Sequence, residues 1–172
     1  LKGRFAGGQF VPYYTRTQIN GGALHGKAPL LGYADDPVEL FFLHIQGSGR
    51  LKTPSGQYVR LGFADKNEYP YVSIGRYMAD KGYLPLGQTT MQGIKAYMQQ
   101  NPQKLAEVLG QNPSYIFFRQ LPGNDEGPIG ALGTPLLGGY ASAVDSHYIT
   151  LGAPLFVATT HPVSNFAHNR LL

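Results

Sequence analysis

The stretch Val38-Glu-Leu-Phe-Phe-Leu-His-Ile45 followed by Gln46-Gly-Ser-Gly49 decides how the first part of the chain is organised. Its first eight residues are almost continuously apolar and rich in residues that favour β structure, which predicts a strand covered on both faces. Because side chains alternate along a strand, one face of it is expected to carry Leu40, Phe42, His44 and Gln46. The two glycines that follow would allow a flat ligand to approach the backbone.

Gln46 and Ser48 offer hydrogen bonds in that glycine-rich string, which makes residues Gln46, Gly47, Ser48 and Gly49 candidates for binding. A β-bulge or tight turn is the plainer interpretation of so short a string. It matches neither a P-loop nor a dinucleotide-binding fingerprint.

Downstream of this string, the pattern predicts a β-hairpin and then two adjacent helices. Residues 50–53 and 57–61 flank Pro54-Ser55-Gly56, a typical hairpin turn. A short helix is predicted from Ser73 to Lys81, with Gly82 at its C-terminal end. The two adjacent helices follow at 89–98 and 101–110, and Thr89 and Gln92 form a capping-box pattern at the start of the first. Residues 115–118 return the chain to a strand.

Helical periodicity disappears from Leu121 to Gly139, where Pro, Gly and small residues dominate, so we place a domain border near Gln120. Beyond it, residues 140–151 and 154–159 are predicted to be two strands of an all-β unit. Upstream, residues 9–31 are expected to form loops and short strands. The fold class predicted is therefore mainly β with a few helices, an α+β arrangement.

Composition excludes several classes of protein. With 42% hydrophobic residues the chain is not intrinsically disordered, and with no Cys it has neither disulfides nor thiolate metal sites. The net charge of +4 is spread along the chain without a dense basic stripe, which argues against nucleic-acid binding and suits an anionic polymer. The five histidines lack metal-binding spacing, so no metal site is expected.

Two further places could carry chemistry. Asp145 lies in an otherwise uncharged, strand-like segment, where a carboxylate is exposed, hydrogen-bonded or functional. A strand-end cap is the alternative for it. The loop at residues 65–71 mixes charged, amide and aromatic groups, a combination suited to sugars but also found in ordinary solvated loops.

Several strings, taken in order along nearly the whole chain, resemble the membrane-bound lytic murein transglycosylase A family. They are Arg16-x-x-Ile19-x-x-Gly22-Ala23-Leu24, Asp36-Pro37, Phe41-Phe42, Ile45-Gln-Gly-Ser-Gly49, Val59-Arg60-x-Gly62, Asn67 to Tyr71-x-Ser73-Ile74-Gly75-Arg76, Asn112-Pro-Ser-Tyr115-x-Phe117-Phe118, Gly130-Ala131, Ala143-Val144-Asp145 and Leu151-Gly152.

The resemblance implies a peptidoglycan lytic transglycosylase, a lyase that works without hydrolysis or cofactor. It would cleave between N-acetylmuramic acid and N-acetylglucosamine and leave 1,6-anhydro-muramyl ends. The implied fold is a small β-rich insert, here residues 1–120, within a double-psi β-barrel, of which residues 121–172 would be a part. The implied location is the periplasm at the outer membrane, held by a lipid anchor outside these residues.

By the same resemblance, the sugar-binding groove takes Gln46 to Gly49 together with Lys66, Asn67, Tyr71 and Ser73. Asp145 matches the first of three barrel aspartates and is expected to support a principal acid that lies beyond residue 172. We therefore expect the chain to be a piece of a longer protein and to be inactive alone. The rival hypothesis is a non-catalytic peptidoglycan-binding or carbohydrate-binding module.

Overall fold

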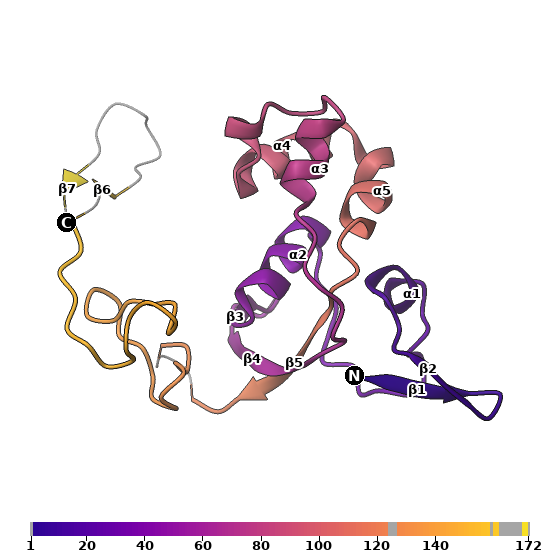
Figure 1. Cartoon of the computed structure of the whole chain (residues 1–172), viewed down its shortest axis with the longest axis horizontal. Helices are drawn as coiled ribbons and strands as arrows, with labels where there is room; N and C mark the ends of the chain where they lie inside the picture. Colours follow the sequence, from indigo (N-terminus) through magenta and orange to yellow (C-terminus); the bar gives the residue numbers. More distant parts are fainter. Residues whose placement is uncertain (1, 124–126, 159, 162–169, 172) are drawn as a thin grey trace. The chain divides into compact units, whose positions relative to one another are not determined.

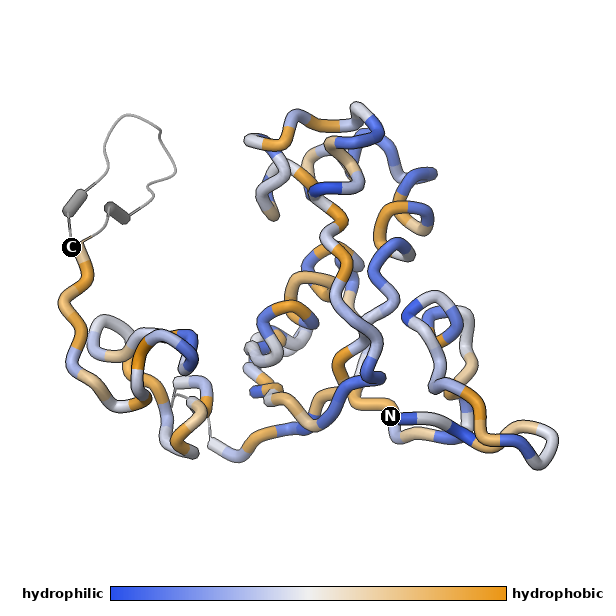
Figure 2. The backbone as a smooth tube through the Cα atoms, in the orientation of Figure 1, coloured by the Kyte–Doolittle hydropathy of each residue, from blue (hydrophilic) through white to orange (hydrophobic). Residues whose placement is uncertain are grey.

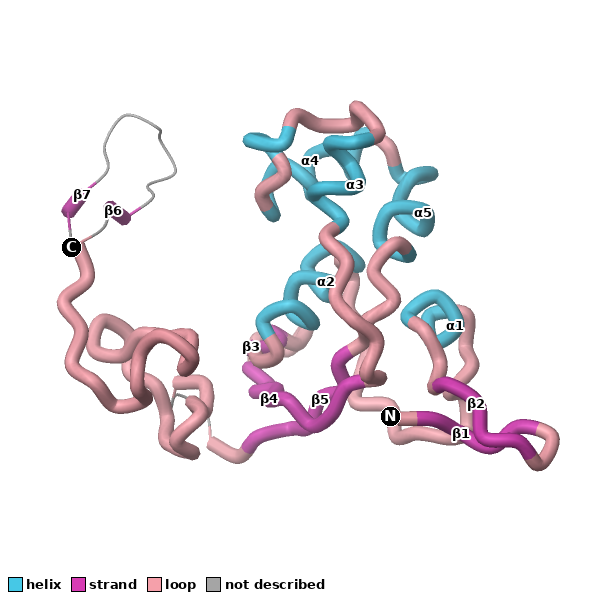
Figure 3. The backbone as a smooth tube through the Cα atoms, in the orientation of Figure 1, coloured by secondary structure: helices cyan, strands magenta, loops and turns pink. Residues whose placement is uncertain are grey.

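The computed structural model describes residues 2–123, 127–158, 160–161 and 170–171, and it mixes helices with small sheets (Figures 1 and 3). The α+β class is as predicted, although the emphasis on β structure is met only loosely, with 29% helix and 19% strand. The chain divides into two compact units, Leu1–Asn124 and Asp125–Leu172. This division falls four residues after Gln120.

The segment predicted to be a buried strand is a helix, α2 (Pro37–Gln46), so that prediction is wrong. The Asp36 carboxylate begins it by accepting hydrogen bonds from the Val38 and Glu39 amides at 2.9 and 3.0 Å, and Pro37 is its first residue. Gly47 ends it in the left-handed conformation with φ 75°.

Helical periodicity also changes which side chains of this segment are buried. Val38, Phe41 and His44, spaced by three residues, face the interior, and Phe42 is only partly buried. The face predicted from strand alternation therefore does not exist.

The predicted helices are confirmed as α3 (Ile74–Asp80), α4 (Met91–Gln100) and a pair formed by η2 (Pro102–Lys104) and α5 (Leu105–Gly110). A short 3-10 turn, η1 (Leu86–Gln88), precedes α4. The cap of α4 is Thr90 instead of Thr89, because the Thr90 hydroxyl accepts from the Gly93 amide. Hydrophobic and hydrophilic residues are interspersed along α3, α4 and α5 (Figure 2).

One hydrophobic core lies among α2, α3, α4 and α5. It consists of Val38, Phe41, Ile74, Met78, Ile94, Met98, Val108 and Leu109. The stripes predicted at residues 91–98 and 105–109 supply half of this core, because their apolar residues recur every three or four positions.

A three-stranded antiparallel sheet in the order β3-β4-β5 begins directly after α2 in the sequence, and its last strand, β5, contacts α2. Its strands are β3 (Gly49–Lys52), β4 (Tyr58–Lys66) and β5 (Ile116–Leu121). The predicted hairpin is confirmed: the Thr53 amide donates to the Gln57 carbonyl at 2.8 Å, and Gly56 takes φ 83°.

The N-terminal part forms a two-stranded hairpin, as the predicted short strands suggested, and one short helix that was not predicted. The hairpin pairs β1 (Gly3–Ala6) with β2 (Gln9–Pro12), and α1 (Arg16–Asn20) follows. Thr15 caps α1 in a capping box with Gln18.

The second unit differs from its prediction. No strand forms over residues 140–158, because neither predicted segment lies against a partner strand among the described residues; residue 159 lies outside them. The backbone forms turns in this segment instead. In one of them the Ile149 amide donates to the Asp145 carbonyl at 3.0 Å. The described residues of this unit include an isolated bridge, Ile129 to Pro135, and a pairing of β6 (Thr160–His161) with β7 (Arg170–Leu171).

Within the described ranges, no helix has the length and apolarity needed to span a bilayer. The same ranges contain no group of three or more His, Cys, Asp or Glu side chains placed to hold a metal ion.

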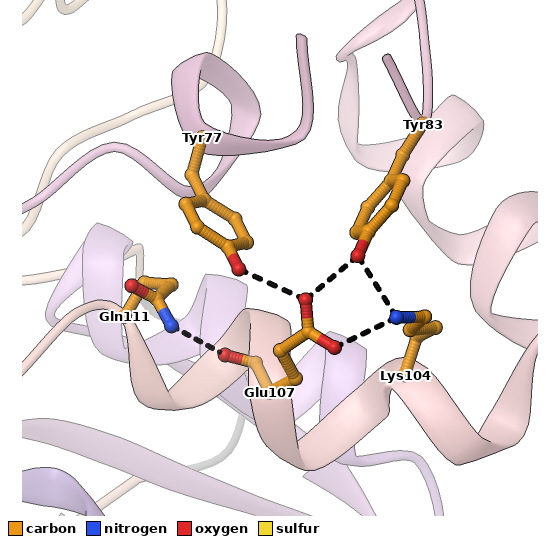
Figure 4. A network of polar contacts seen from close by, with 5 residues as sticks. All are labelled: Tyr77, Tyr83, Lys104, Glu107 and Gln111. Atoms are coloured by element: carbon orange, nitrogen blue, oxygen red, sulfur yellow. Dashed lines mark hydrogen bonds and ion pairs between the residues drawn. The ribbon is translucent and has the colours of Figure 1, made fainter. Parts of the chain in front are cut away.

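A polar network centred on Glu107 joins α3, the segment before α4, η2 and α5 (Figure 4). The Tyr77 and Tyr83 hydroxyls donate to Oε1 of Glu107 at 2.9 and 2.7 Å, and Lys104 Nζ donates to Oε2 at 2.9 Å. These bonds, that of Lys104 foremost, lower the pKa of Glu107 from 4.5 to about 2. Glu107 is therefore a half-buried carboxylate that links these helices to one another.

We expect Glu107→Gln to lower the melting temperature at about pH 7. Because the folded-state pKa is depressed, the contribution of the carboxylate is present above the unfolded pKa of 4.5 and is lost as the pH falls to about 2. Thermal unfolding followed by circular dichroism should show the two proteins becoming equal in that window. Asp80→Asn, which removes an exposed ion pair with Arg76, is the control and should change little. A deficit of Glu107→Gln that persists unchanged at low pH would contradict this.

Candidate functional site

Asn67 anchors the loop that was predicted to line a groove, and its side chain is buried. Its Nδ2 donates to the Tyr14 and Pro113 carbonyls at 2.9 and 2.8 Å, and its Oδ1 accepts from the Tyr115 amide at 2.8 Å. All of these bonds are internal. Asn67 therefore positions the loop, and its amide is not presented to a ligand.

Two further bonds hold the loop between Asn67 and α3. The Tyr69 hydroxyl donates to the Tyr13 carbonyl at 2.9 Å, and the Val72 amide donates to Oδ1 of buried Asn112 at 3.2 Å. Glu68 lies at φ 66°, a conformation that non-glycine residues adopt only when the surroundings enforce it. The backbone on both sides of Tyr71 is thus fixed.

The other predicted members of this loop are exposed. The Tyr71 side chain is 55% exposed, which leaves an aromatic face free on a fixed backbone. Ser73 caps α3, with its hydroxyl accepting from the Arg76 amide at 3.2 Å. The Lys66 side chain is exposed, and its carbonyl accepts from Lys2 Nζ at 2.7 Å.

Arg16 is a buried support of this region that sequence reasoning did not select. Its Nε donates to the Asn112 carbonyl at 3.1 Å and its Nη2 to the Ser114 carbonyl at 2.6 Å. The guanidinium also stacks over the rings of Phe41 and Tyr115, with Cζ 4.7 and 5.3 Å from their centroids. Burial lowers the pKa of Arg16 to about 10, so it stays protonated at neutral pH.

His44 lies beside Arg16 as the interior residue that was predicted. Its Nδ1 faces Arg16 Nη2 at 3.5 Å and the Ile116 amide at 3.4 Å, so this nitrogen acts as the acceptor. Burial, and secondarily the Arg16 charge, lower the pKa of His44 to about 3. Because His44 is neutral, the positively charged guanidinium of Arg16 can lie next to it in the interior without charge repulsion.

The string Gln46 to Gly49 leaves the end of α2, not the end of a strand. Among the described residues, neither the Gln46 nor the Ser48 side chain has an internal hydrogen-bond partner, so their polar groups remain available. Gly49 begins β3, where a Cβ would collide with Leu43.

The two groups of candidate residues flank one strand. Gly49 pairs with Leu61 in β4, whereas Lys66 is at the far end of β4 and pairs with Ile116. Five residues of strand separate these points, which is about 17 Å. An extended oligomer could contact both groups, and their convergence on one groove stays a prediction.

Asp145 belongs to the second unit and lies in an exposed turn. Its Oδ1 accepts from the His147 amide at 2.9 Å and lies 2.9 Å from Nδ1 of the same residue. These bonds, the backbone one first, lower the pKa of Asp145. A carboxyl group with a lowered pKa is ionised at neutral pH, which suits a supporting charge better than a general acid.

Comparison with known proteins gives a consistent result. A family model described as the MltA specific insert domain matches residues 1–119. Membrane-bound lytic murein transglycosylase A of Vibrio cholerae is 32% identical over 144 residues, which cover 82% of this chain and 38% of that protein.

Solved structures agree with these matches. A monoclinic crystal structure of MltA from Neisseria gonorrhoeae has a TM-score of 0.84 and 78% identity, covering 99% of this chain and 44% of the other. Escherichia coli MltA with bound chitohexaose has a TM-score of 0.71 and 30% identity, covering 79% and 40%. The chain thus spans less than half the length of these relatives.

Proposed function

Because this chain belongs to the membrane-bound lytic murein transglycosylase A family, we propose that it forms part of an enzyme that cleaves the glycan strands of peptidoglycan. The observation that carries the proposal is the family match over residues 1–119. The cleavage would fall between N-acetylmuramic acid and N-acetylglucosamine and leave 1,6-anhydro-muramyl ends.

A single carboxylic acid is sufficient for this reaction. It protonates the glycosidic oxygen, and the resulting carboxylate then accepts the proton of the sugar's own 6-hydroxyl as that oxygen attacks the anomeric carbon. No second carboxylate is needed to hold a water, unlike in inverting glycosidases. We assign the principal acid to residues outside this chain and a supporting role to the ionised Asp145.

We assign glycan contacts to Tyr71, Lys66 and Ser73 on the anchored loop and to Gln46 and Ser48 at the end of α2. An exposed ring on a rigid backbone suits the apolar face of a sugar, and unpaired amide and hydroxyl groups suit its edge. The separation of the two groups along β4 favours an extended strand over a single sugar. Binding of chitohexaose by the E. coli relative supports a glycan ligand.

The proposed location is the periplasmic side of the outer membrane, reached through a lipid anchor outside these residues. The relatives in Vibrio cholerae and Escherichia coli are named as membrane-bound enzymes, which supports attachment to a membrane.

Product analysis tests the enzymatic proposal. The longer protein should release 1,6-anhydro-muropeptides from purified peptidoglycan, and the 172-residue chain should release none, because its principal acid is missing. Mass spectrometry separates anhydro ends from reducing ends by one water. Reducing ends from the longer protein would indicate hydrolysis and contradict the proposal, and anhydro products from the chain alone would contradict the placement of the acid.

The alternative is a non-catalytic module that binds peptidoglycan. The observation in its favour is that the family model covers an insert domain and ends at residue 119. Binding to peptidoglycan by the longer protein, without any product, would support this alternative.

A further inference from the structure

Two cations converge on a single tyrosine in the N-terminal part of the chain. Arg4 of β1 stacks on the Tyr14 ring, with Cζ 4.2 Å from its centroid. Lys27 Nζ lies 5.4 Å from the same centroid and donates to the Tyr14 hydroxyl at 3.2 Å. Two like charges on one ring repel each other, so the arrangement favours an anion beside them.

Both cations keep donors that no protein group uses. Among the described residues, no carboxylate forms an ion pair with Arg4 or Lys27, and Arg4 makes no hydrogen bond. Lys27 uses two of its three N–H groups, on the Tyr14 hydroxyl and the Ala23 carbonyl. Arg4 Nε is buried and has no hydrogen-bond partner. The terminal N–H groups of the guanidinium are therefore the donors that a planar acceptor such as a carboxylate would use.

Tyr14 is tied directly to the loop that carries Tyr71. Its backbone carbonyl accepts from Nδ2 of buried Asn67 at 2.9 Å, so the ring stands on the same rigid support as the loop. The neighbouring Tyr13 carbonyl accepts from Tyr69 of that loop. The tyrosine that carries the two cations is therefore attached to the residues that anchor this loop.

The distribution of charge favours the same kind of ligand. Thirteen of the fourteen Lys and Arg residues precede position 124, compared with seven of the ten acids. The first unit therefore has a formal net charge of +6, compared with +4 for the whole chain. A basic surface selects polymers that carry negative groups.

We propose that Arg4 and Lys27, arranged on Tyr14, form a subsite for a carboxylate of the glycan substrate. The inference rests on the proposed function. Muramyl glycans carry carboxylates on the lactyl ether when it is free and on the stem peptide when that is attached. Both present the planar acceptor pair that a guanidinium fork binds.

Calorimetric titration of the 172-residue chain tests the subsite with three tetrasaccharides of equal length. The first is neutral chitotetraose, the second carries free muramyl lactyl carboxylates, and the third carries stem peptides. We expect a carboxylated glycan to bind about three- to tenfold more tightly than chitotetraose, with a preference that weakens as salt is added. If the second glycan binds more tightly than the third, the carboxylate is that of the lactyl ether. If the third binds more tightly, the carboxylate belongs to the stem peptide.

Substitutions separate the subsite from the groove. Arg4→Gln and the exposed Lys27→Gln should each reduce the preference for carboxylated glycans while leaving the affinity for chitotetraose unchanged. Arg50→Gln is the matched control, since Arg50 also stacks on an exposed tyrosine, Tyr58, with Cζ 5.4 Å from its centroid. It should leave the preference intact. Tyr71→Ala should weaken all three glycans together.

Equal affinity of the unsubstituted chain for all three glycans would overturn the subsite and leave the groove in place. So would a preference retained in both Arg4→Gln and Lys27→Gln. Binding of none of the three would overturn the subsite together with the glycan groove.

Discussion

Replacing Phe41 by Ala lowers the free energy of unfolding by about 3 to 5 kcal/mol. The ring is 1% exposed, packs in the core among α2, α3, α4 and α5, and supports the guanidinium of Arg16. Its truncation removes buried apolar surface and leaves a cavity in a close-packed interior. Urea denaturation followed by circular dichroism measures the change.

Phe42→Ala is the matched control for Phe41→Ala. Phe42 is the next residue of the same helix but only packs against the edge of the core, so we expect less than half of the loss. A strand covered on both faces would bury both rings and give similar losses for the two substitutions. A loss for Phe42→Ala as large as that for Phe41→Ala would therefore contradict the helix.

Asn67→Ala lowers the free energy of unfolding by about 2 to 4 kcal/mol. The substitution removes three side-chain hydrogen bonds and leaves the Tyr115 amide without its Asn67 Oδ1 acceptor in the interior. The Tyr14 and Pro113 carbonyls lose a donor as well. An unsatisfied buried polar group costs more than its hydrogen bond contributes when formed.

Gln111→Ala is the control for Asn67→Ala, because this exposed amide makes one bond, to the Glu107 carbonyl at 3.0 Å. It should cost well under about 1 kcal/mol. Similar losses for the two variants, in denaturation measured as above, would mean that Asn67 is not the anchor of the loop.

The sequence predicted the helices after residue 73 well and α2 badly, and the reason is the presence or absence of a helical period in the apolar residues. In α3, α4 and α5, apolar residues recur at helical spacing between recognisable caps. The run at 38–45 is too uniformly apolar to show a period, and only Asp36-Pro37 before it and Gly47 after it mark a helix. Those capping residues were the signal that could have identified it.

The second unit was mispredicted for a different reason. Residues 140–158 have a strand-like composition, but a strand forms only against a partner, and β propensity depends on that context. Composition alone could not reveal that no partner strand lies against them among the described residues.

The candidate site was predictable only in its exposed part. Tyr71 and Lys66 are exposed as a groove residue requires, whereas Asn67 has the same composition signal and lies inside. Arg16 and Asn112, which are buried, were singled out only as letters within the family strings. Arg16 bonds to residues 96 and 98 positions away, and the Asn112 side chain bonds to Val72, 40 positions away; no local pattern contains such contacts.

The long-range bonds of Asn67 and Arg16 also determine how the loop can move. They join segments that are 53 and 96 residues apart along the chain, so neither end of the loop can open without separating whole parts of the first unit. The hydrogen-bonded amide protons of Asn67 and Val72 should therefore exchange with solvent only when these long-range contacts open. The surface that carries Tyr71 is then a preorganised platform, and a glycan that binds there pays no entropy for ordering it.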